Sequence, residues 1–250
     1  MTISKRQYIV IGSIAYLLAL LLTLPANLFT SQINRLHPQL QVSGIEGSLW
    51  RGQVDQLLFK QKPIKNLEWK FQPLALLLGR IQLRLAYQDR DNNIELDMAM
   101  SIRNQLQITN VEGQINSAFI QSYTPYTVPA LHGVLVFKDL DVILAGRRPL
   151  RAEGELEWRG AEVDLGQKVS LGNVLLSLEQ TEKGIKALLT EQSGLLQGEA
   201  GLLLDEEGHY TLEARFTPTS KGKHLERHLA LVLRKTSDGS YQRSLNGQFP

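Results

Sequence analysis

Apolar and polar residues alternate along most of this chain, and the pattern is clearest between residues 44 and 87. Residues 67–71 (LEWKF) place Leu, Trp and Phe at every second position, and residues 81–87 (IQLRLAY) repeat the alternation. Because successive side chains of a strand point to opposite faces, each run predicts a strand with one apolar and one polar face. Between these runs, residues 74–79 (LALLLG) follow Pro73, which favours a short helical turn ending at the glycine.

The same alternation recurs downstream in short runs that are separated by turn-forming sequences. The expected strands are residues 94–102, 106–108, 113–115, 131–137, 140–144, 154–158, 174–178, 185–189, 202–204, 210–216 and 241–245. Polar turns that end in glycine, such as 181–184 (TEKG) and 205–208 (DEEG), connect some of them as hairpins. Short helices are expected only at residues 117–123 and 225–233. The chain is therefore predicted to be mainly β, with a large curved antiparallel or meander sheet and a few short helices.

A sheet of this kind has one apolar face, and that face must be covered. The cover is a second sheet layer, as in a sandwich, or the few helical turns, or a ligand in an open groove. The sequence leaves these alternatives open. The candidate lining residues of a groove are Leu83, Leu85, Leu96, Met98, Leu135 and Phe137.

The beginning of the chain differs from the rest because it contains an apolar run without charges. Residues 8–24 (YIVIGSIAYLLALLLTL) would span about 26 Å as a helix, close to the thickness of a bilayer core. A cleaved signal peptide ends in small residues at a spacing that residues 24–26 (LPA) fit poorly. A retained transmembrane helix over residues 8–26 is therefore favoured. Lys5 and Arg6 precede it, which predicts a cytoplasmic amino terminus.

The domain organisation follows from this anchor. The expected parts are a cytoplasmic tail at 1–7, the transmembrane helix at 8–26, a connector at 27–41 and a β domain at 42–250, with 42–125 and 130–218 as two similar halves followed by a C-terminal segment. The halves rest on an echo between residues 47–55 and 154–164, which share a Gly-x-Leu start and a Trp-Arg-Gly sequence. An echo this short is as compatible with chance as with repetition. In a bacterium with two membranes, the β domain lies in the periplasm.

Charge and composition exclude several classes of function. The chain has 27 Lys and Arg against 25 Asp and Glu, a net charge of +2, and Lys5 and Arg6 account for the excess. A neutral body lacks the basic face that binds nucleic acid. The chain contains no cysteine, so disulfides, thiolate nucleophiles and cysteine zinc sites are excluded as well.

No pattern of residues indicates a reaction. The nucleophile-elbow, P-loop, HExxH and dinucleotide fingerprints are all missing from the sequence. His224 and His228 are spaced to share one helix face, but no third metal ligand is evident nearby, so a solvated helix face is the preferred interpretation. The acidic runs 89–92 and 205–207 do not follow the spacing of calcium loops and are interpreted as hairpin turns. No catalytic residue, cofactor or metal is predicted.

The tryptophans and glycines are interpreted as structural. Trp50 lies between Gly47 and Gly52, where a missing side chain lets a large ring or a neighbouring backbone approach closely. Trp50 and Trp69 are expected to fill a core, with ligand contact as the alternative. The residues expected to define the fold are Gly47, Leu49, Trp50, Gly52, Trp69, Pro73, Gly79, Gly133, Gly154 and Trp158.

Motifs spread over nearly the whole chain carry a family resemblance. They are a single span ending at Pro25-Ala26, then 47–52 (GSLWRG), 67–69 (LEW) leading to Pro73-Leu74, 77–79 (LLG), 129–133 (PALHG), 154–161 (GELEWRGA), 198–200 (GEA) and 205–210 (DEEGHY). With these motifs the chain resembles the protein N family of the bacterial type II secretion system. Ser48 stands where the family usually has Thr.

The resemblance implies a location and a role. It implies a single-pass inner-membrane protein with a periplasmic body, which serves the export of folded proteins across the outer membrane together with other secretion subunits and has no enzyme activity. The family also looks distantly similar to the AsmA-like group, whose curved sheets form apolar grooves for lipid, although fold analogy alone does not establish a function. Two hypotheses follow: an accessory or assembly subunit of the secretion machine and, as the alternative, a periplasmic binder of lipid or another hydrophobic ligand.

Overall fold

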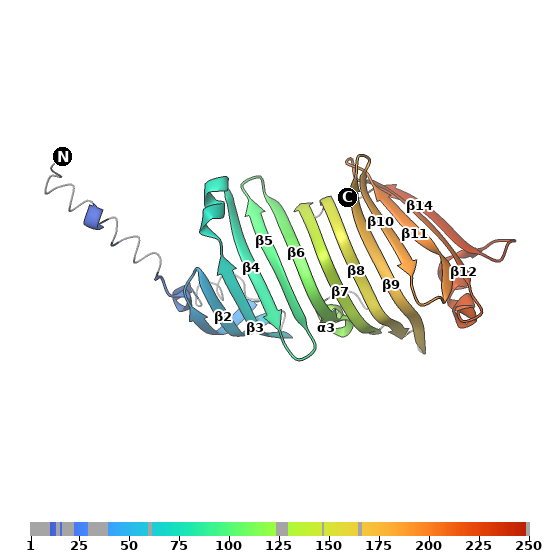
Figure 1. Cartoon of the computed structure of the whole chain (residues 1–250), viewed down its shortest axis with the longest axis horizontal. Helices are drawn as coiled ribbons and strands as arrows, with labels where there is room; N and C mark the ends of the chain where they lie inside the picture. The colour runs from blue at the N-terminus through green and yellow to red at the C-terminus, as the bar shows by residue number, and fades with distance from the viewer. Residues whose placement is uncertain are drawn as a thin grey trace. The chain divides into compact units, whose positions relative to one another are not determined.

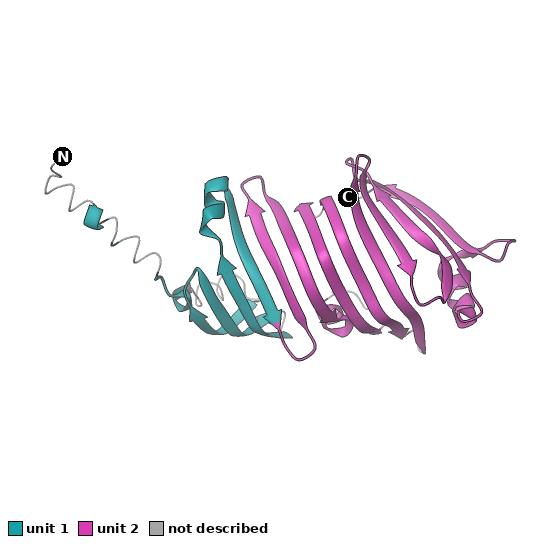
Figure 2. Cartoon of the chain, in the orientation of Figure 1, with its two compact units in different colours: residues 1–87 teal, residues 88–250 magenta. Residues whose placement is uncertain are grey.

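Strands joined by tight turns make up most of the described chain. In this computed structural model the described residues are 11–13, 16, 23–29, 40–59, 62–123, 130–146, 148–164 and 167–248. The predicted tail lies outside these residues, as do most of the predicted transmembrane helix and of the connector. Within the described residues, no helix is both long and apolar enough to cross a membrane. The chain divides into two compact units, residues 1–87 (unit 1) and 88–250 (unit 2) (Figure 2).

Unit 1 is an antiparallel meander in which each strand pairs with the next one along the chain. Its strands are β1 (Leu40–Gly47), β2 (Arg51–Phe59), β3 (Lys62–Phe71) and β4 (Arg80–Gln88) (Figure 1). The runs 67–71 and 81–87 thus form paired strands, as predicted. A short 3-10 helix, η1 (Ala26–Phe29), precedes the sheet.

The dense leucine run between β3 and β4 forms a second 3-10 helix, η2 (Pro73–Leu78). Pro73 occupies its first turn, where a missing backbone N–H costs nothing. Gly79 ends it in the left-handed conformation, with φ of 68°, and its N–H caps the carbonyls of Ala75 and Leu76. The predicted helical turn is confirmed, with the start and end residues that the sequence indicates.

Unit 2 is a longer meander with the strand order β5 to β12, then β14, then β13. Its strands are β5 (Asn93–Ser101), β6 (Gln105–Asn116), β7 (Ala130–Ala145), β8 (Arg148–Asp164), β9 (Lys168–Thr181), β10 (Gly184–Glu191), β11 (Leu196–Leu204), β12 (His209–Pro218), β13 (Arg234–Lys235) and β14 (Tyr241–Gln248). Its helices are α3 (Ser117–Tyr123), η3 (Lys223–Leu225) and α4 (Glu226–Val232). Both predicted helical regions and the last predicted strand are confirmed.

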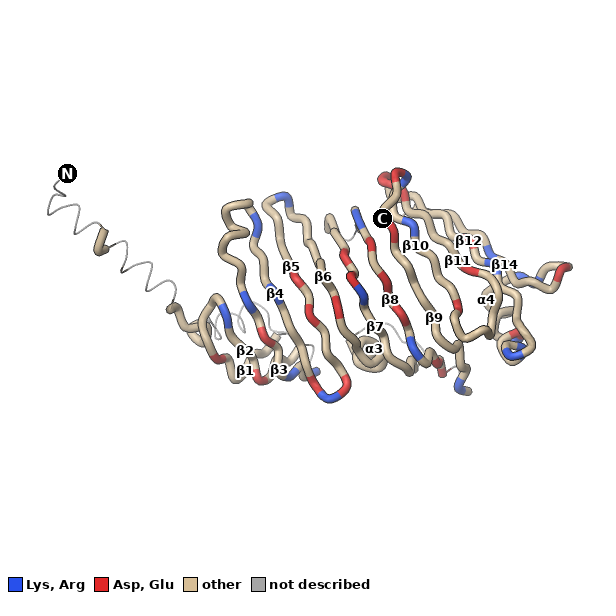
Figure 3. The backbone as a smooth tube through the Cα atoms, viewed as in Figure 1, with Lys and Arg blue, Asp and Glu red and all other residues tan. Residues whose placement is uncertain are grey.

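The sheet of unit 2 has one apolar face and one charged face. Directly opposed residues share a face, so the register places Phe137, Leu156, Leu176 and Leu189 in one row across β7 to β10. The other face carries ion pairs, among them Lys138 Nζ with Glu157 at 3.6 Å and Arg159 with Glu157 at 2.8 Å. Figure 3 shows charged residues along β7 and β8. The apolar row is only half-buried, so this face is open over part of its length.

β-Bulges interrupt the ladders of unit 2 at aligned positions. Asn110 on β6 has a φ of 53°, and its backbone N–H donates to Asp141 Oδ1 at 2.7 Å, next to a register shift in β7. Its side-chain amide donates to the buried carboxylate of Asp97 on β5 at 3.0 Å, where β5 also shifts register. A bulge bends a strand and increases its twist, so aligned bulges bend neighbouring strands together.

The predicted fold class is confirmed in its main point, a mainly β, antiparallel chain with few short helices. In each unit the first and last strands of the order are not paired with one another, so the sheets are open and the sandwich alternative is not what forms. Two boundaries were predicted wrongly. Residues 106–108 and 113–115 belong to the single strand β6, and residues 131–144 to the single strand β7, because bulges let a strand continue through an interruption in its alternation.

Candidate functional site

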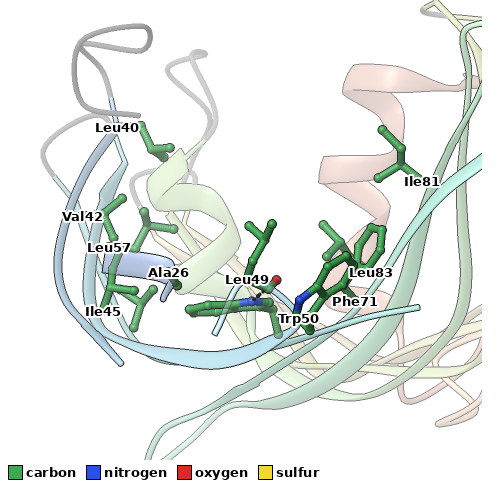
Figure 4. A pocket seen from close by; sticks show the side chains of 12 residues that line it. Ala26, Leu40, Val42, Ile45, Leu49, Trp50, Leu57, Phe71, Ile81 and Leu83 are labelled. Carbon is green, nitrogen blue, oxygen red and sulfur yellow. Dashed lines mark hydrogen bonds between the residues drawn. The ribbon is translucent and has the colours of Figure 1, made fainter. Parts of the chain in front are cut away.

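Unit 1 contains an apolar cavity of about 450 Å³. Its lining residues are Ala26, Leu40, Val42, Ile45, Leu49, Trp50, Val54, Leu57, Trp69, Phe71, Ile81 and Leu83. They come from η1, from all four strands of unit 1 and from the connection between β1 and β2. Figure 4 shows the side chains of β1 and β2 on one side and those of Phe71, Ile81 and Leu83 on the other, with Trp50 next to Phe71.

Within some of the strands, the apolar side chains switch from one face of the sheet to the other, and the cavity lining depends on this switch. In a regular strand Val42 and Ile45 would point to opposite faces, because three positions separate them. Gly44 lies between them with a φ of 67°, and it is skipped in the pairing with β2. On β3, Asn66 has a φ of 54° and is skipped in the same way. These left-handed residues flip the alternation, so both Val42 and Ile45 line the cavity.

The two tryptophans form part of the cavity wall. The rings of Trp50 and Phe71 are 5.1 Å apart between centroids and tilted by 57°, a favourable edge-to-face type of contact. Trp69 Nε1 donates a hydrogen bond to the carbonyl oxygen of Leu49 at 3.2 Å. The indole N–H is thereby satisfied, and the ring presents an apolar surface to the cavity. Both rings are half-buried rather than enclosed in a core.

Glycines let the backbone and the rings come close. A Cβ at Gly52 would lie 2.5 Å from Trp69 Cζ2, so the ring packs directly on the backbone of β2. Gly47 has a φ of 93°, which favours glycine at the turn into β2. The short turn between β1 and β2 depends on both features, and this turn positions Leu49 and Trp50 in the wall.

The segment before η1 is attached to the same corner of the sheet. Leu49 N donates to Leu24 O at 2.9 Å, and Pro25 forms an isolated antiparallel bridge with Ser48. Ala26, which follows directly, is only 6% exposed and closes one side of the cavity. The end of the predicted transmembrane segment thus contributes to the cavity wall.

This arrangement can bind a ligand by burying apolar surface, but it offers no group for acid, base or nucleophilic chemistry. None of the lining residues is titratable. Carboxyl groups with shifted pKa values lie elsewhere. Among them, a hydrogen bond from Arg159 lowers the pKa of Glu157, and hydrogen bonds from Thr236 and Ser240 lower that of Asp238. These two carboxylates serve ion pairs and turns on the surface of unit 2. The volume lies within the range of about 300–1,000 Å³ that small-molecule sites occupy.

The structure brings together about half of the residues that the sequence singled out. Leu49, Trp50 and Trp69 line the cavity, and Gly47 and Gly52 shape the turn beside it. The other predicted residues lie elsewhere: Pro73 and Gly79 at the two ends of η2, and Gly133, Gly154 and Trp158 in unit 2. Their role in defining the fold stays a prediction.

Trp158 makes a contact in unit 2 like that of Trp69 in unit 1. Its Nε1 donates to the carbonyl oxygen of His132 at 2.9 Å, and a Cβ at the adjacent Gly133 would lie 2.8 Å from that nitrogen. In both units an indole N–H bonds a carbonyl on a neighbouring strand or turn and the ring packs beside a glycine. This is a likeness of two contacts, and the two similar halves stay a prediction.

Sequence reasoning missed Val42, Ile45, Leu57 and Phe71 as neighbours in one cavity. Alternation assigns Val42 and Ile45 to opposite faces, so only the left-handed conformation of Gly44 would have indicated their common side. Of the six predicted groove residues, Leu83 alone lines the cavity. The signal available in the sequence was Gly44 itself, since a glycine inside a strand often marks a bulge or twist.

The histidines and acids of the predicted turns do not form a convincing metal site. His224 Nε2 lies 3.3 Å from Ser170 O, and His228 Nδ1 lies 3.3 Å from His224 O, so both rings are engaged with backbone. Asp205, Glu207 and His209 come together in the turn after β11. Asp205 Oδ1 accepts hydrogen bonds from the backbone N–H groups of Glu207 and His209, which accounts for this grouping as turn formation.

Comparison with known proteins finds a matching family and named relatives. Residues 38–244 match the family described as type II secretion system (T2SS), protein N. The chain is 26% identical over 222 residues to type II secretion system protein N of Aeromonas hydrophila, with 82% of each chain covered. It is 24% identical over 237 residues to the protein of the same name from Vibrio cholerae serotype O1, with 90% of this chain and 91% of the relative covered. No solved structure matches.

The site thus defines a β protein with an apolar cavity and no catalytic side chains in its wall. The family match covers most of the chain, and it confirms the resemblance seen in the sequence motifs. The chain belongs to the type II secretion system protein N family, and it is a component of type II secretion.

Proposed function

We propose that this protein is a non-enzymatic accessory or assembly component of the type II secretion system, which is held in the bacterial inner membrane and supports protein export across the outer membrane. The family match over residues 38–244 carries this proposal. The residues that line the cavity include no titratable group with which to move a proton or attack a bond.

Contact with other secretion subunits would use the open sheet edges. The edge of β14 is paired with β13 only at Tyr241 and Gln242, so residues 243–248 present backbone groups to a partner strand. An exposed edge can accept an added strand, with main-chain hydrogen bonds supplying the affinity. The identity of the partner subunits is left to experiment.

Export of a secreted enzyme tests the required role. A chain that lacks residues 42–250 is compared with the full chain in cells whose own copy is deleted. We expect loss of export with the short chain and normal export with the full chain. A full chain with the replacement Gly201→Ala serves as the control, because a Cβ at this position meets nothing within 4 Å. Unchanged export and an unchanged composition of the secretion complex in the short chain would refute the proposal.

The membrane orientation is tested with single cysteines, since the natural chain has none. Ser4→Cys lies in the proposed cytoplasmic tail, and Lys65→Cys lies on an exposed position of β3. A thiol reagent that cannot cross the inner membrane should label residue 65, and not residue 4, from the periplasmic side. Labelling of residue 4 alone would place the β domain in the cytoplasm.

The apolar cavity favours a second candidate function, the binding of a lipid or another hydrophobic ligand. An apolar volume of about 450 Å³ lined by two tryptophans and ten aliphatic or aromatic residues is a suitable environment for an acyl chain. The replacement Leu57→Trp fills the cavity, whereas Leu58→Trp alters the next residue of β2, which is not part of the lining. Native mass spectrometry should show co-purified lipid with the natural chain and with Leu58→Trp, and much less with Leu57→Trp. Equal lipid in all three, or none, would remove this candidate.

A further inference from the structure

Among the described residues of unit 1, the most exposed apolar cluster lies on η2, outside the cavity. Leu74, Leu76, Leu77 and Leu78 are 76%, 50%, 84% and 70% exposed, and we call these four side chains the leucine tip. In Figure 1 η2 is the coil that leads into the start of β4, between β3 and β4. Single exposed leucines are common on soluble proteins, but four within five positions form a patch that calls for a partner.

Several backbone polar groups of the tip are hydrogen-bonded within the turn, which lowers the cost of moving the tip out of water. Gly79 N–H bonds the carbonyls of Ala75 and Leu76, and Ala75 N–H bonds the carbonyl of Gln72 at 3.1 Å. Ala75 is itself only 6% exposed. Entry into an apolar phase is costly mainly for unpaired backbone groups, and here several are paired within the turn. Six residues of 3-10 helix extend about 12 Å, comparable with the depth of about 5–10 Å that interfacial segments reach.

Basic residues lie on the two strands, β3 and β4, that lead into and out of the tip. No acidic residue occurs between Glu68 and Asp89, whereas Lys70, Arg80 and Arg84 all lie in this interval. Lys70 and Arg84 are directly opposite one another on β3 and β4, and both are exposed. Arg80 follows the tip after Gly79, and within the described part of the chain its Nε is buried without a hydrogen-bond partner. An apolar tip above a cluster of cations complements a bilayer with anionic headgroups.

We propose that the leucine tip inserts into the interface of an anionic phospholipid bilayer, with Lys70, Arg80 and Arg84 facing the lipid phosphates. A protein partner fits the composition less well, because binding hot spots are rich in Trp and Tyr and poor in Leu, and the tip is leucine throughout. The proposal rests on the inner-membrane location of the proposed function. Ile81 follows Arg80, is 55% exposed and lines the cavity, so insertion brings the rim of the cavity to the membrane surface.

A fluorescent label on a single cysteine tests the insertion directly. The full chain with Leu77→Cys carries an environment-sensitive dye on the tip, and the full chain with Lys65→Cys carries it on β3, eight residues before Pro73 and about 25 Å along the strand. Both are reconstituted into vesicles of phosphatidylethanolamine and phosphatidylglycerol, with or without brominated acyl chains. We expect a blue-shifted emission and several-fold stronger quenching at residue 77 than at residue 65.

Two further variants show which feature is responsible. Leu74→Ser should reduce the membrane-inserted fraction of the labelled tip about tenfold, because a buried leucine contributes most of its apolar surface to the transfer. Lys70→Gln with Arg84→Gln should lower insertion in phosphatidylglycerol vesicles by about fivefold per charge, and should have little effect in phosphatidylcholine vesicles. A loss of equal size in both lipids would overturn the role of the basic residues.

The outcome that overturns the proposal is an aqueous emission at residue 77 in both kinds of vesicle. Shielding of the label that appears only with added secretion subunits, or only with rising protein density, would assign the tip to a protein partner or to a second copy, and would overturn it equally. Export in cells is scored separately with the same variants. Aqueous emission at residue 77 of the otherwise natural chain, together with normal export, refutes the lipid contact alone, whereas normal export without residues 42–250 refutes the proposed function.

Discussion

Replacing Gly52 by alanine tests whether the Trp69 ring is held against the backbone of β2. A Cβ at residue 52 would lie 2.5 Å from Trp69 Cζ2 and 2.6 Å from Cη2, and it would also collide with the carbonyl oxygen of Glu46. These distances are shorter than van der Waals contact, so the ring or the strand must move. Overpacking of this kind costs about 1–3 kcal/mol of the free energy of unfolding.

The assay is urea unfolding of the full chain in detergent, followed by tryptophan fluorescence. Trp158→Phe in the background confines the signal to Trp50 and Trp69, and therefore to unit 1. With an m value of about 1–3 kcal/mol per molar urea, the midpoint should fall by about 1 M for Gly52→Ala. The matched control is Gly201→Ala, also in a strand, where a Cβ has open space and φ is not left-handed. Because Gly201 lies in unit 2, that substitution should leave the midpoint reported by Trp50 and Trp69 unchanged.

Equal midpoints for the two alanine variants would refute the close packing of the ring on β2. A double-mutant cycle sharpens the test. Trp69→Leu removes the far end of the ring, so Gly52→Ala should cost less in that background than in the natural chain. An unchanged cost would show that the clash involves the backbone of Glu46 alone, and that the ring is not held there.

Three further predictions concern unit 2. The hydrogen bond from Arg159 lowers the pKa of Glu157 in the folded chain below its ordinary value of 4.5. The contribution of this ion pair to stability is therefore fully present above pH 4.5, and it is lost as the pH falls through the lowered pKa. The loss of stability on acidification should therefore be shallower for Glu157→Gln, as measured by thermal unfolding between pH 6 and about 3. Asn110→Ala should cost about 2–4 kcal/mol in urea unfolding, because it puts alanine at a φ of 53° and removes one hydrogen-bond donor to the buried Asp97. Asn110→Gly should cost less, because glycine adopts this backbone conformation without strain. Trp158→Phe should cost about 1 kcal/mol in urea unfolding followed by circular dichroism, through the loss of its hydrogen bond to a backbone carbonyl, and an unchanged midpoint would show that this bond is not stabilising.

Much of the fold could be predicted from the local alternation of apolar and polar residues. Residues 67–71, 81–87 and 94–101 form strands where alternation predicts them, and Pro73 and Gly79 mark the ends of η2. Hairpin pairing follows because polar turns with glycine leave only short connections between consecutive strands. The open form of the sheets was one of the alternatives, since the pattern of one strand does not show what covers its apolar face.

The cavity was much less predictable, because it depends on departures from alternation. Gly44 and Asn66 adopt left-handed conformations that reverse the sidedness of β1 and β3, and no periodic pattern contains this information. Trp50 and Trp69 were expected mainly as core residues. They line a cavity instead, because no second layer closes over them within the described part of unit 1. The leucine run of η2 was predicted as a helical turn. Its exposure could not be predicted, because it depends on which other parts of the fold pack against the turn.

The backbone bonds that join residues 24 and 25 to the corner at residues 48 and 49 have a mechanical consequence. A pull on the chain ahead of Leu24 reaches β1 and β2 through these bonds, without first stretching the residues between η1 and β1. Wherever Leu24 is fixed, unit 1 is fixed with little slack. A force on the domain would likewise be transmitted to whatever holds the amino-terminal segment, as through a short rigid link.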